Sequence, residues 1–517
     1  MSTAPSWTEA PRALPGREAV ADLRALLAFR SAGLAPRART RLRVAGLGVL
    51  VVTVLVIALP AWLGGPQPRP HAGAALALLP SGCLGFLALA CMTAVASAGG
   101  RELVPRDQAV AFPVSSTTDH LGALLLAPLN VAWLLQAWML LGATSYGLGP
   151  ARLAAYVVPV LLWILAATCA AQAVGWLAEG VRRGPHGILL IRLTTGVLAL
   201  GLVALATTGT LTDVLDHSPT GHVLDAVLDG ATGHWLPWAT AVAVLAGLAL
   251  ACTLLGALPA RWALGRPMRE ELRHEGSRHP ARPTPASDLA MVLRLDRGSV
   301  WRSVPLRRGL TVLAVMPGAV ALLGNLEWAM MTVLPGLVAS GAALLFGVNT
   351  WCLDGRGALW RHSLPVAARV SFAARAIVLG EILLGAAGVT LLLGGVRAGL
   401  PTPAEGLSLV CCTLVVALQV VGASMRWSIA RPFSVDLRSA RATPAPPVTM
   451  AAYSARLALV TTVTGLVFTG FARLGQVEPV LLVTLVMLLW SAWRLERTAQ
   501  RWDDPVLRAR VVSVVAG

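Results

Sequence analysis

The sequence predicts an all-α polytopic membrane protein with about twelve transmembrane helices, arranged as two parallel six-helix repeats that each follow a cytoplasmic amphipathic helix. Three observations predict this class. Of the 517 residues, 56% are hydrophobic and only 13% are charged, whereas soluble domains carry roughly 25% charged residues. The mean hydropathy is +0.70. Apolar segments long enough to cross a bilayer recur along the whole chain.

A helix needs about 20 apolar residues to cross the hydrocarbon core of a bilayer. By this criterion we expect spans over residues 44–64, 73–98, 121–147, 153–178, 189–211, 236–260, 309–326, 329–351, 370–396, 406–425, 450–472 and 479–494. The organisation that follows is a cytoplasmic N-terminal segment over 1–43, six-span halves over 44–264 and 309–494, a cytoplasmic linker with the second amphipathic helix over 265–308, and a cytoplasmic tail over 495–517.

The arginines predict the orientation of these spans. All 42 basic residues are Arg, a bias that is typical of a GC-rich bacterial genome. With the N-terminus in the cytoplasm, the outward loops hold only Arg69, Arg152, Arg397 and Arg473, beside a larger set of acids: Asp213, Asp216, Asp225, Asp229, Glu327, Glu405 and Glu478. The positive-inside rule therefore predicts that both termini lie on the cytoplasmic side of a bacterial cytoplasmic membrane. The net charge of +17 then fits anionic lipid headgroups and requires no nucleic-acid partner.

Two cytoplasmic elements occur once in each half. Asp22–Arg30, before the first span, has apolar residues at helical spacing, and Asp288–Asp296 repeats the pattern before the seventh span. The loop over Arg101–Ser115, between spans two and three, matches Leu353–Ala367, between spans eight and nine. Both loops carry an acid near the end of the preceding span and a Pro-Val pair before the next. The amphipathic helices are expected to lie on the cytoplasmic membrane surface.

Two shorter matches lie inside the spans. Gln172-Ala-Val-Gly matches Gln419-Val-Val-Gly in spans four and ten, and Arg192-Leu matches Arg456-Leu at the inner ends of spans five and eleven. Together with the cytoplasmic elements, these matches follow one another in the same order in both halves. They predict an internal duplication.

The most unusual residue within a predicted span is Glu381, which lies near the middle of the ninth. An ionised carboxylate is costly in the hydrocarbon core. Glu381 is therefore either a substrate or proton site, or a structural carboxylate that is protonated or paired with a group on another helix. Four uncharged polar residues within the membrane either join helices by hydrogen bonds or line a substrate path: Asn130, Gln172, Asn349 and Gln419.

No catalytic or metal-binding motif is present in the sequence. A chain without Lys has no ordinary phosphate-binding loop, Schiff-base lysine or Ser-x-x-Lys pair. The nearest candidate for a membrane enzyme is the outward segment Asp213–Asp229, with His217 and His222. Most of the other histidines, including His120, are expected to be solvated loop residues. The 7 Cys have no metal or disulfide spacing and are expected to be small core residues, and the first 43 residues show no signal peptide.

The outward segment between spans five and six, Leu211–Trp238, also carries apolar residues among its acids. Their spacing predicts one or two short helices that dip into the outer leaflet. The corresponding loop in the second half, Arg473–Pro479, is too short for such helices.

With these elements in place, the chain resembles the permease subunits of type-2 class ABC exporters, in a fused form with two six-span halves. The resemblance rests on the amphipathic helices, on the Glu102 and Asp354 loops with their Pro-Val exits, and on the segment between spans five and six. It implies that the amphipathic helices and these loops contact a separate ATPase. The implied contact residues are Asp22, Arg30, Arg101, Glu102, Arg106, Asp107, Asp288, Asp296, Asp354, Arg356 and Arg361.

The resemblance further implies an ABC ATPase partner in two copies that binds ATP and Mg, with no cofactor in this chain. The transported molecule would be a hydrophobic or amphipathic solute, such as a drug, an antibiotic or a lipid-like molecule. The main alternative is an ion-coupled secondary transporter of the major facilitator type that uses Glu381. The stretches Gly100–Arg106 and Leu353–Gly357 do not fit the loop motif of that class. A membrane-embedded enzyme and a non-transporting assembly protein are further alternatives.

Overall fold

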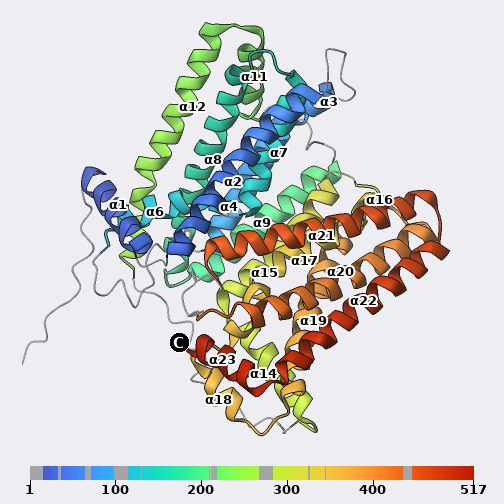
Figure 1. Cartoon of the computed structure of the whole chain (residues 1–517). Coiled ribbons are helices and arrows are strands. Elements are labelled where there is room, and N and C mark those ends of the chain that lie inside the picture. The colour runs from blue at the N-terminus through green and yellow to red at the C-terminus, as the bar shows by residue number, and fades with distance from the viewer. Residues whose placement is uncertain are drawn as a thin grey trace, which may run out of the picture. The chain divides into compact units, whose positions relative to one another are not determined.

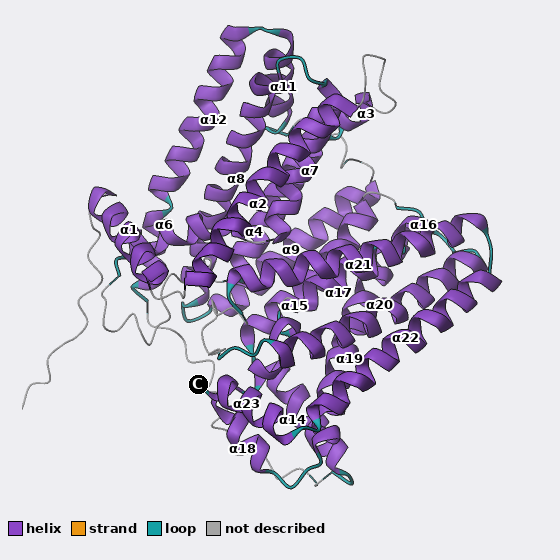
Figure 2. Cartoon of the chain, viewed as in Figure 1, coloured by secondary structure: helices purple, strands orange, loops and turns teal. Residues whose placement is uncertain are grey.

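The computed structural model describes residues 16–32, 36–63, 72–97, 114–129, 131–208, 210, 218–266, 283, 285–323, 326–343, 345–434 and 445–517. Every regular element within these ranges is a helix (Figure 2). Seven helices there are long and apolar enough to cross a membrane, or up to nine if each of two bent helix pairs is one span. The prediction of an all-helical protein suited to a membrane is confirmed. The number of spans, their orientation and the duplication stay predictions.

The chain divides into two compact units, Met1–His274 and Glu275–Gly517. The boundary falls within the segment predicted to be a linker. Each unit has a hydrophobic core of its own.

The first unit is organised around its longest helix, α8. Its helices are α1 (Gly16–Ala32), α2 (Pro36–Leu63), α3 (Ala72–Ala77), α4 (Leu79–Ala96), α6 (Ser116–Leu126), η1 (Ala127–Leu129), α7 (Val131–Leu148), α8 (Leu153–Arg182), α9 (Gly187–Thr208), α11 (Gly221–Thr232), α12 (Trp235–Leu255) and α13 (Ala257–Leu264). Helix α8 buries Tyr156, Trp163 and Trp176 and packs against α4, α11, α12 and α13. Figure 1 shows α8 among α4, α7, α11 and α12.

The segment predicted as a span over 121–147 is not a single α-helix in the structure. The helix begins earlier, because Ser115 accepts a hydrogen bond from the backbone N–H of Thr118 and so caps α6. It changes to a 3-10 turn at Ala127–Leu129, which contains Pro128. Proline lacks a backbone N–H, so Pro128 cannot donate the hydrogen bond that would continue α6 as an α-helix. A short helix, α11, does follow α9, in the segment where the sequence predicts one or two.

The second unit contains α14 (Asp288–Arg302), α15 (Val304–Leu323), α16 (Trp328–Met331), α17 (Leu334–Ala343), η3 (Gly347–Leu353), η4 (Gly355–Gly357), α18 (Ala358–Ser363), α19 (Ala368–Ala398), α20 (Pro403–Ala430), α21 (Pro447–Leu474), α22 (Glu478–Trp502) and α23 (Pro505–Ala516). Ser287 caps α14 by accepting a hydrogen bond from the Ala290 N–H. Thr402 and Glu405 form a capping box at the start of α20. The amphipathic helix α14 meets the following helix at 82°, an angle that suits a surface helix followed by a span.

One further expectation for the second unit is corrected. The predicted span over 329–351 is broken, because the segments Trp328–Ala343 and Gly347–Leu353 are bent by 42° and Asn349 has non-helical φ and ψ of −150° and 77°. The segment predicted to be the cytoplasmic tail, 495–517, is largely helical. Helix α22 continues to Trp502, and α23 packs against α18 and η4.

The helices that the predicted duplication would match pack in similar pairs in the two units. In the first unit α2 packs against α7 and α8 against α12, and in the second unit α15 packs against α19 and α20 against α22. The amphipathic helix of each unit contacts the start of the third predicted span, since α1 packs on α6 and α14 packs on α19. The matched glycines differ, however. A Cβ on Gly175 would lie 2.8 Å from Ala94 of α4, whereas one on Gly422 would lie 3.9 Å from the Ser491 oxygen of α22.

Candidate functional site

Four charged side chains meet in the second unit and form what we call the ionic cluster: Asp296, Asp354, Arg361 and Arg375. Asp296 and Arg375 are 0% exposed. Arg375 donates from Nη2 to Asp354 Oδ1 at 2.7 Å and to Asp296 Oδ1 at 3.0 Å. Arg361 donates to Asp296 Oδ2 at 3.1 Å and to Asp354 Oδ1 at 3.0 Å. Two carboxylates therefore neutralise two guanidinium groups.

The cluster joins three segments that are distant in the sequence. Asp296 lies on α14, Asp354 and Arg361 lie in the loop between predicted spans eight and nine, and Arg375 lies in the second turn of α19. Arg375 also donates to the backbone oxygen of Thr350. The cluster thus fixes the amphipathic helix and the loop to the start of a predicted span.

Aromatic rings enclose one side of the cluster. The Arg375 guanidinium lies 5.2 Å from the centre of the Trp351 ring. Trp351 stacks on Trp502, with ring centres 4.1 Å apart. Trp502 ends α22, so this stack ties a further helix to the same region.

Opposing effects set the ionisation of Asp296. Burial raises the pKa of this carboxyl group, while the charges and hydrogen bonds of Arg375 and Arg361 lower it, and the net pKa is lowered. Asp296 is therefore ionised at neutral pH. Removing a charge from a buried ionic group of this kind leaves the remaining charges uncompensated.

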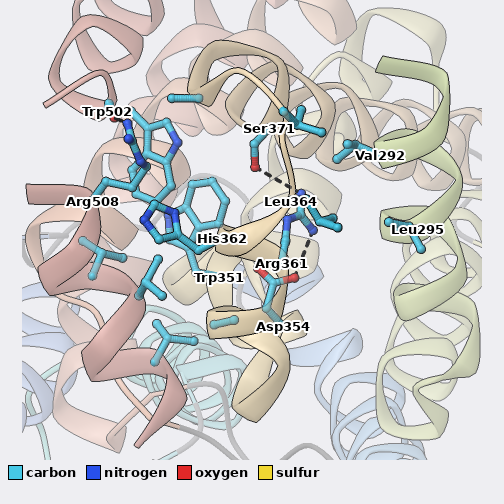
Figure 3. A pocket seen from close by; sticks show the side chains of 16 residues that line it. Val292, Leu295, Trp351, Asp354, Arg361, His362, Leu364, Ser371, Trp502 and Arg508 are labelled. Atoms are coloured by element: carbon cyan, nitrogen blue, oxygen red, sulfur yellow. Dashed lines mark hydrogen bonds and ion pairs between the residues drawn. The ribbon is translucent and has the colours of Figure 1, made fainter. Parts of the chain in front are cut away.

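A cavity of about 100 Å³ lies beside the cluster. Figure 3 shows Arg361 and Asp354 on one side of it, and Trp351, His362, Trp502 and Arg508 on another. Helices α14, α18, α19, α22 and α23 contribute to its walls. Both carboxylates of the cluster are engaged by guanidinium groups, so the arrangement is suited to holding elements together rather than to proton transfer.

The structure brings together three of the residues predicted to contact an ATPase. Asp296, Asp354 and Arg361 meet in the ionic cluster, whereas Asp288 and Arg356 are exposed on its outside. Asp22 and Arg30 lie in α1. Four other predicted contact residues and one predicted membrane residue lie outside the described residues: Arg101, Glu102, Arg106, Asp107 and Asn130.

Sequence reasoning missed Arg375. The signal was available, because a charged residue inside an apolar span normally faces a partner within the protein. Arg375 lies in a predicted span, as Glu381 does, and its partners are Asp296 and Asp354.

Glu381 is paired with an arginine on the amphipathic helix. Its carboxylate accepts a hydrogen bond from Arg297 Nε at 2.9 Å, and its side chain is 41% exposed. This geometry corresponds to the structural alternative for Glu381, a carboxylate paired with an Arg on another helix. The position of Glu381 near the middle of the bilayer stays a prediction.

Two of the uncharged polar residues of the predicted spans make hydrogen bonds between segments. Asn349 Nδ2 donates to the Phe433 backbone oxygen at 2.8 Å. Gln419 Oε1 on α20 accepts a hydrogen bond from Thr464 Oγ1 on α21 at 3.1 Å. Gln172 is buried within α8.

The first unit has a buried histidine where the sequence analysis expects a solvated one. His120 is 0% exposed. Trp176 Nε1 donates to His120 Nδ1 at 3.2 Å, so Nε2 carries the proton and donates to the Thr253 backbone oxygen at 3.1 Å. Burial lowers the pKa of His120, partly opposed by the Thr253 hydrogen bond and the charge of Asp119. The expectation was wrong because these partners lie in α8 and α12, far along the sequence.

A second ionic group lies at the C-terminal end of α8. Glu179 accepts hydrogen bonds from Arg182 at 3.1 Å and from Arg183 at 3.0 Å. Arg183 also donates to the backbone oxygen of Ala263 at 2.8 Å. This group therefore fastens α13 to the end of α8.

The histidine, cysteine and acidic residues were also compared with the sequence-based expectations for metal binding and disulfides. Within the described residues, no group of three or more His, Cys, Asp or Glu could hold a metal ion. His222 lies 3.5 Å from Asp225 in an exposed pair, while 211–217 lie outside the described ranges. All the cysteines are free, five of them buried and two of them half-buried, as expected of small core residues.

No protein-family model, no curated protein and no solved structure matches the chain. The function is therefore argued from the residues and their arrangement.

Proposed function

We propose that this chain is the membrane-spanning permease subunit of an ATP-driven exporter. Two copies of a separate ABC ATPase would bind ATP and Mg and drive it. The transported molecule would be a hydrophobic or amphipathic solute that leaves the cell across the bacterial cytoplasmic membrane. The chain itself would carry no catalytic site and would contribute the two six-span halves, with both termini in the cytoplasm.

The observation that carries the proposal is the ionic cluster. It joins the amphipathic helix α14, the loop before α19 and α19 itself through buried, charge-neutral contacts. A permease without a nucleotide site needs cytoplasmic elements that move together with a span when a partner pushes on them. The cluster supports this role because α14 and the loop could not move away from α19 without separating buried charges.

The surface next to the cluster is suited to a protein partner. In α18, Leu359 is 60% and Trp360 is 61% exposed, and Arg356 is exposed close by. Exposed aromatic and arginine side chains are enriched among the residues that dominate protein interfaces. This loop is also the segment that the resemblance assigns to the ATPase.

The paired packing within each unit supports the predicted duplication. Span one with span three and span four with span six pack together in both units. Each amphipathic helix contacts the start of span three. Two halves built in this way would give two ATPase copies comparable places to act.

The test is to purify the full chain gently from its native membrane and to identify bound proteins by mass spectrometry. We expect an ATPase in about two copies per chain. The double variant Leu359→Ser/Trp360→Ser should lose it from at least one site. Leu400→Ser is the matched control, because Leu400 is 97% exposed just beyond the opposite end of α19. Absence of an ATPase from the intact chain, or equal loss in the control, would contradict the proposal.

A further inference from the structure

Three arginines near one end of the second unit have no acidic partner in the part of the chain that the structure describes. They are Arg426 on α20, Arg456 on α21 and Arg494 on α22. Among the residues that the structure describes, none of the three makes an ion pair within 4.0 Å. By contrast, Arg297, Arg361, Arg369 and Arg375 of the same unit are all paired with carboxylates.

The three helices bring these arginines to the same end of the bundle. Helices α20, α21 and α22 run side by side (Figure 1). Because the chain reverses direction between successive helices, the end of α20, the start of α21 and the end of α22 coincide. The arginine distribution assigns this end to the cytoplasmic side.

Contacts between the helices place the three arginines in the same region of the bundle. On the α20–α22 side, a Cβ on Gly422 would lie 3.9 Å from the Ser491 oxygen, and Arg426 and Arg494 follow these residues by about one turn. On the α20–α21 side, the hydroxyl groups of Ser424 and Tyr453 are 2.5 Å apart.

The Trp427 and Tyr453 rings on the same side have centres 5.3 Å apart. Arg456 follows Tyr453 by about one turn of α21. Three like charges held together without carboxylates are destabilising unless an anion lies between them.

Helix α22 presents aromatic side chains on the face that carries Arg494. Trp490 and Trp493 stack with ring centres 5.0 Å apart and are 58% and 46% exposed. The Arg497 guanidinium lies 4.4 Å from the centre of the Trp493 ring. Positions 490, 493, 494 and 497 share one face of a helix. Exposed Trp beside Arg at the end of a span is typical of the membrane interface.

We propose that Arg426, Arg456 and Arg494 form a binding site for a phosphate group, and that this phosphate is the headgroup of an anionic phospholipid. Arginine guanidinium groups bind phosphate oxygens through paired N–H donors. The acyl chains would lie along the apolar faces of α21 and α22, where Leu459, Leu485 and Leu489 are exposed. The Trp490–Trp493 pair favours a lipid over a free anion, because a free phosphate would gain nothing from exposed indole rings. The site does not depend on the proposed transport function.

The test uses native mass spectrometry of the full chain in detergent, titrated with phosphatidylglycerol or with zwitterionic phosphatidylcholine. Each basic residue near an anionic lipid contributes about 1 kcal/mol, or about fivefold in affinity. We therefore expect Arg426→Gln, Arg456→Gln and Arg494→Gln each to weaken phosphatidylglycerol binding about fivefold. Arg494→Lys should keep most of the binding, because it keeps the charge. Arg192→Gln, at an exposed arginine of α9 in the first unit, is the control that should change nothing.

Three outcomes would overturn the proposal. They are equal binding of the two lipids by the intact chain, unchanged phosphatidylglycerol binding in the Gln variants, and displacement of the lipid by millimolar inorganic phosphate, which would assign the site to a free anion. Arg426 and Arg456 are exposed, so their single variants should fold even if Arg494→Gln does not. They keep the test decisive.

Discussion

The ionic cluster predicts that Asp296→Asn will strongly destabilise the second unit. Asp296 is 0% exposed and accepts hydrogen bonds from both Arg361 and Arg375. An asparagine has nearly the same shape but no charge. The variant would leave two guanidinium groups facing the single carboxylate of Asp354, so the cluster would change from neutral to a net charge of about +1.

The magnitude follows from this change. Breaking a buried ion pair by removing one partner costs about 3–5 kcal/mol. In a unit of this size, 1 kcal/mol shifts the midpoint of thermal unfolding by about 2–4 °C. We therefore expect the melting temperature of the second unit to fall by about 6–20 °C.

A thiol-reactive dye can report this unfolding locally. Cys352 is 2% exposed and lies two residues before Asp354. In a protein whose other cysteines are replaced, the reaction of Cys352 with the dye therefore reports unfolding at the ionic cluster. Asp288→Asn is the matched control on the same helix. It removes an exposed acid from the first turn of α14, which stabilises a helix by about 0.3–1 kcal/mol. A melting temperature for Asp296→Asn no lower than that of Asp288→Asn would refute the reasoning.

The pH dependence of the same unit has a definite sign. The pKa of Asp296 is lowered from 3.8 in the folded protein. Its contribution to stability is therefore complete above that value and is lost as the pH falls through the lower, folded-state pKa. The melting temperature of the intact second unit should not respond to Asp296 between pH 5 and pH 8.

Three further predictions concern other parts of the chain. Because the pKa of His120 is lowered from 6.5, the first unit should lose stability as the pH falls below that value, and His120→Phe should remove this dependence in a thermal melt followed by buried first-unit thiols. Gly175→Ala should destabilise the first unit by about 1–3 kcal/mol in the same melt, because the added Cβ would lie 2.8–3.0 Å from atoms of Ala94 in α4. The control is Gly247→Ala, which should be neutral or slightly stabilising because its Cβ would have no neighbouring atom within 4 Å. Glu381→Gln should cost no more than about 1 kcal/mol and leave transport into inverted vesicles unchanged; loss of transport would instead favour the ion-coupled alternative.

The sequence predicted the segments that form the candidate site but did not predict the contacts between them. The helical spacing of Asp288–Asp296 and the charges of the loop around Asp354 predicted two cytoplasmic elements. The structure places a helix over the first and joins both through Asp296, Asp354 and Arg361. What the pattern could not show is that these charges face inward, toward one another and Arg375. Local periodicity describes which face of a helix is polar, not whether another polar face covers it.

The errors have the same physical origin. His120 was read as solvated because the residues around it are polar, yet its partners come from α8 and α12. The span over 121–147 was predicted from hydropathy, which averages over a window and does not register the break at Pro128. In both cases hydrophobicity alone was used where a hydrogen-bonding requirement decided the outcome.

Variants of the ionic cluster can distinguish a role in stability from a role in transmitting movement between α14 and α19. Replacing a whole buried ion pair by apolar residues is often neutral or stabilising, whereas removing one partner is costly. The double variant Asp296→Leu/Arg375→Met would leave Asp354 and Arg361 paired at 3.0 Å, so the remaining charges still balance. We expect it to melt within about 5 °C of the intact chain, unlike Asp296→Asn.

If the cluster serves only to hold the fold together, this double variant should behave as the intact chain in every assay. If it transmits movement between α14 and α19, the variant should keep its bound ATPase and lose substrate-stimulated ATP hydrolysis. Directional hydrogen bonds between charged groups fix the relative orientation of two helices, and apolar contacts allow them to slide. Unchanged stimulation in a variant of normal stability would therefore contradict a transmitting role for the cluster.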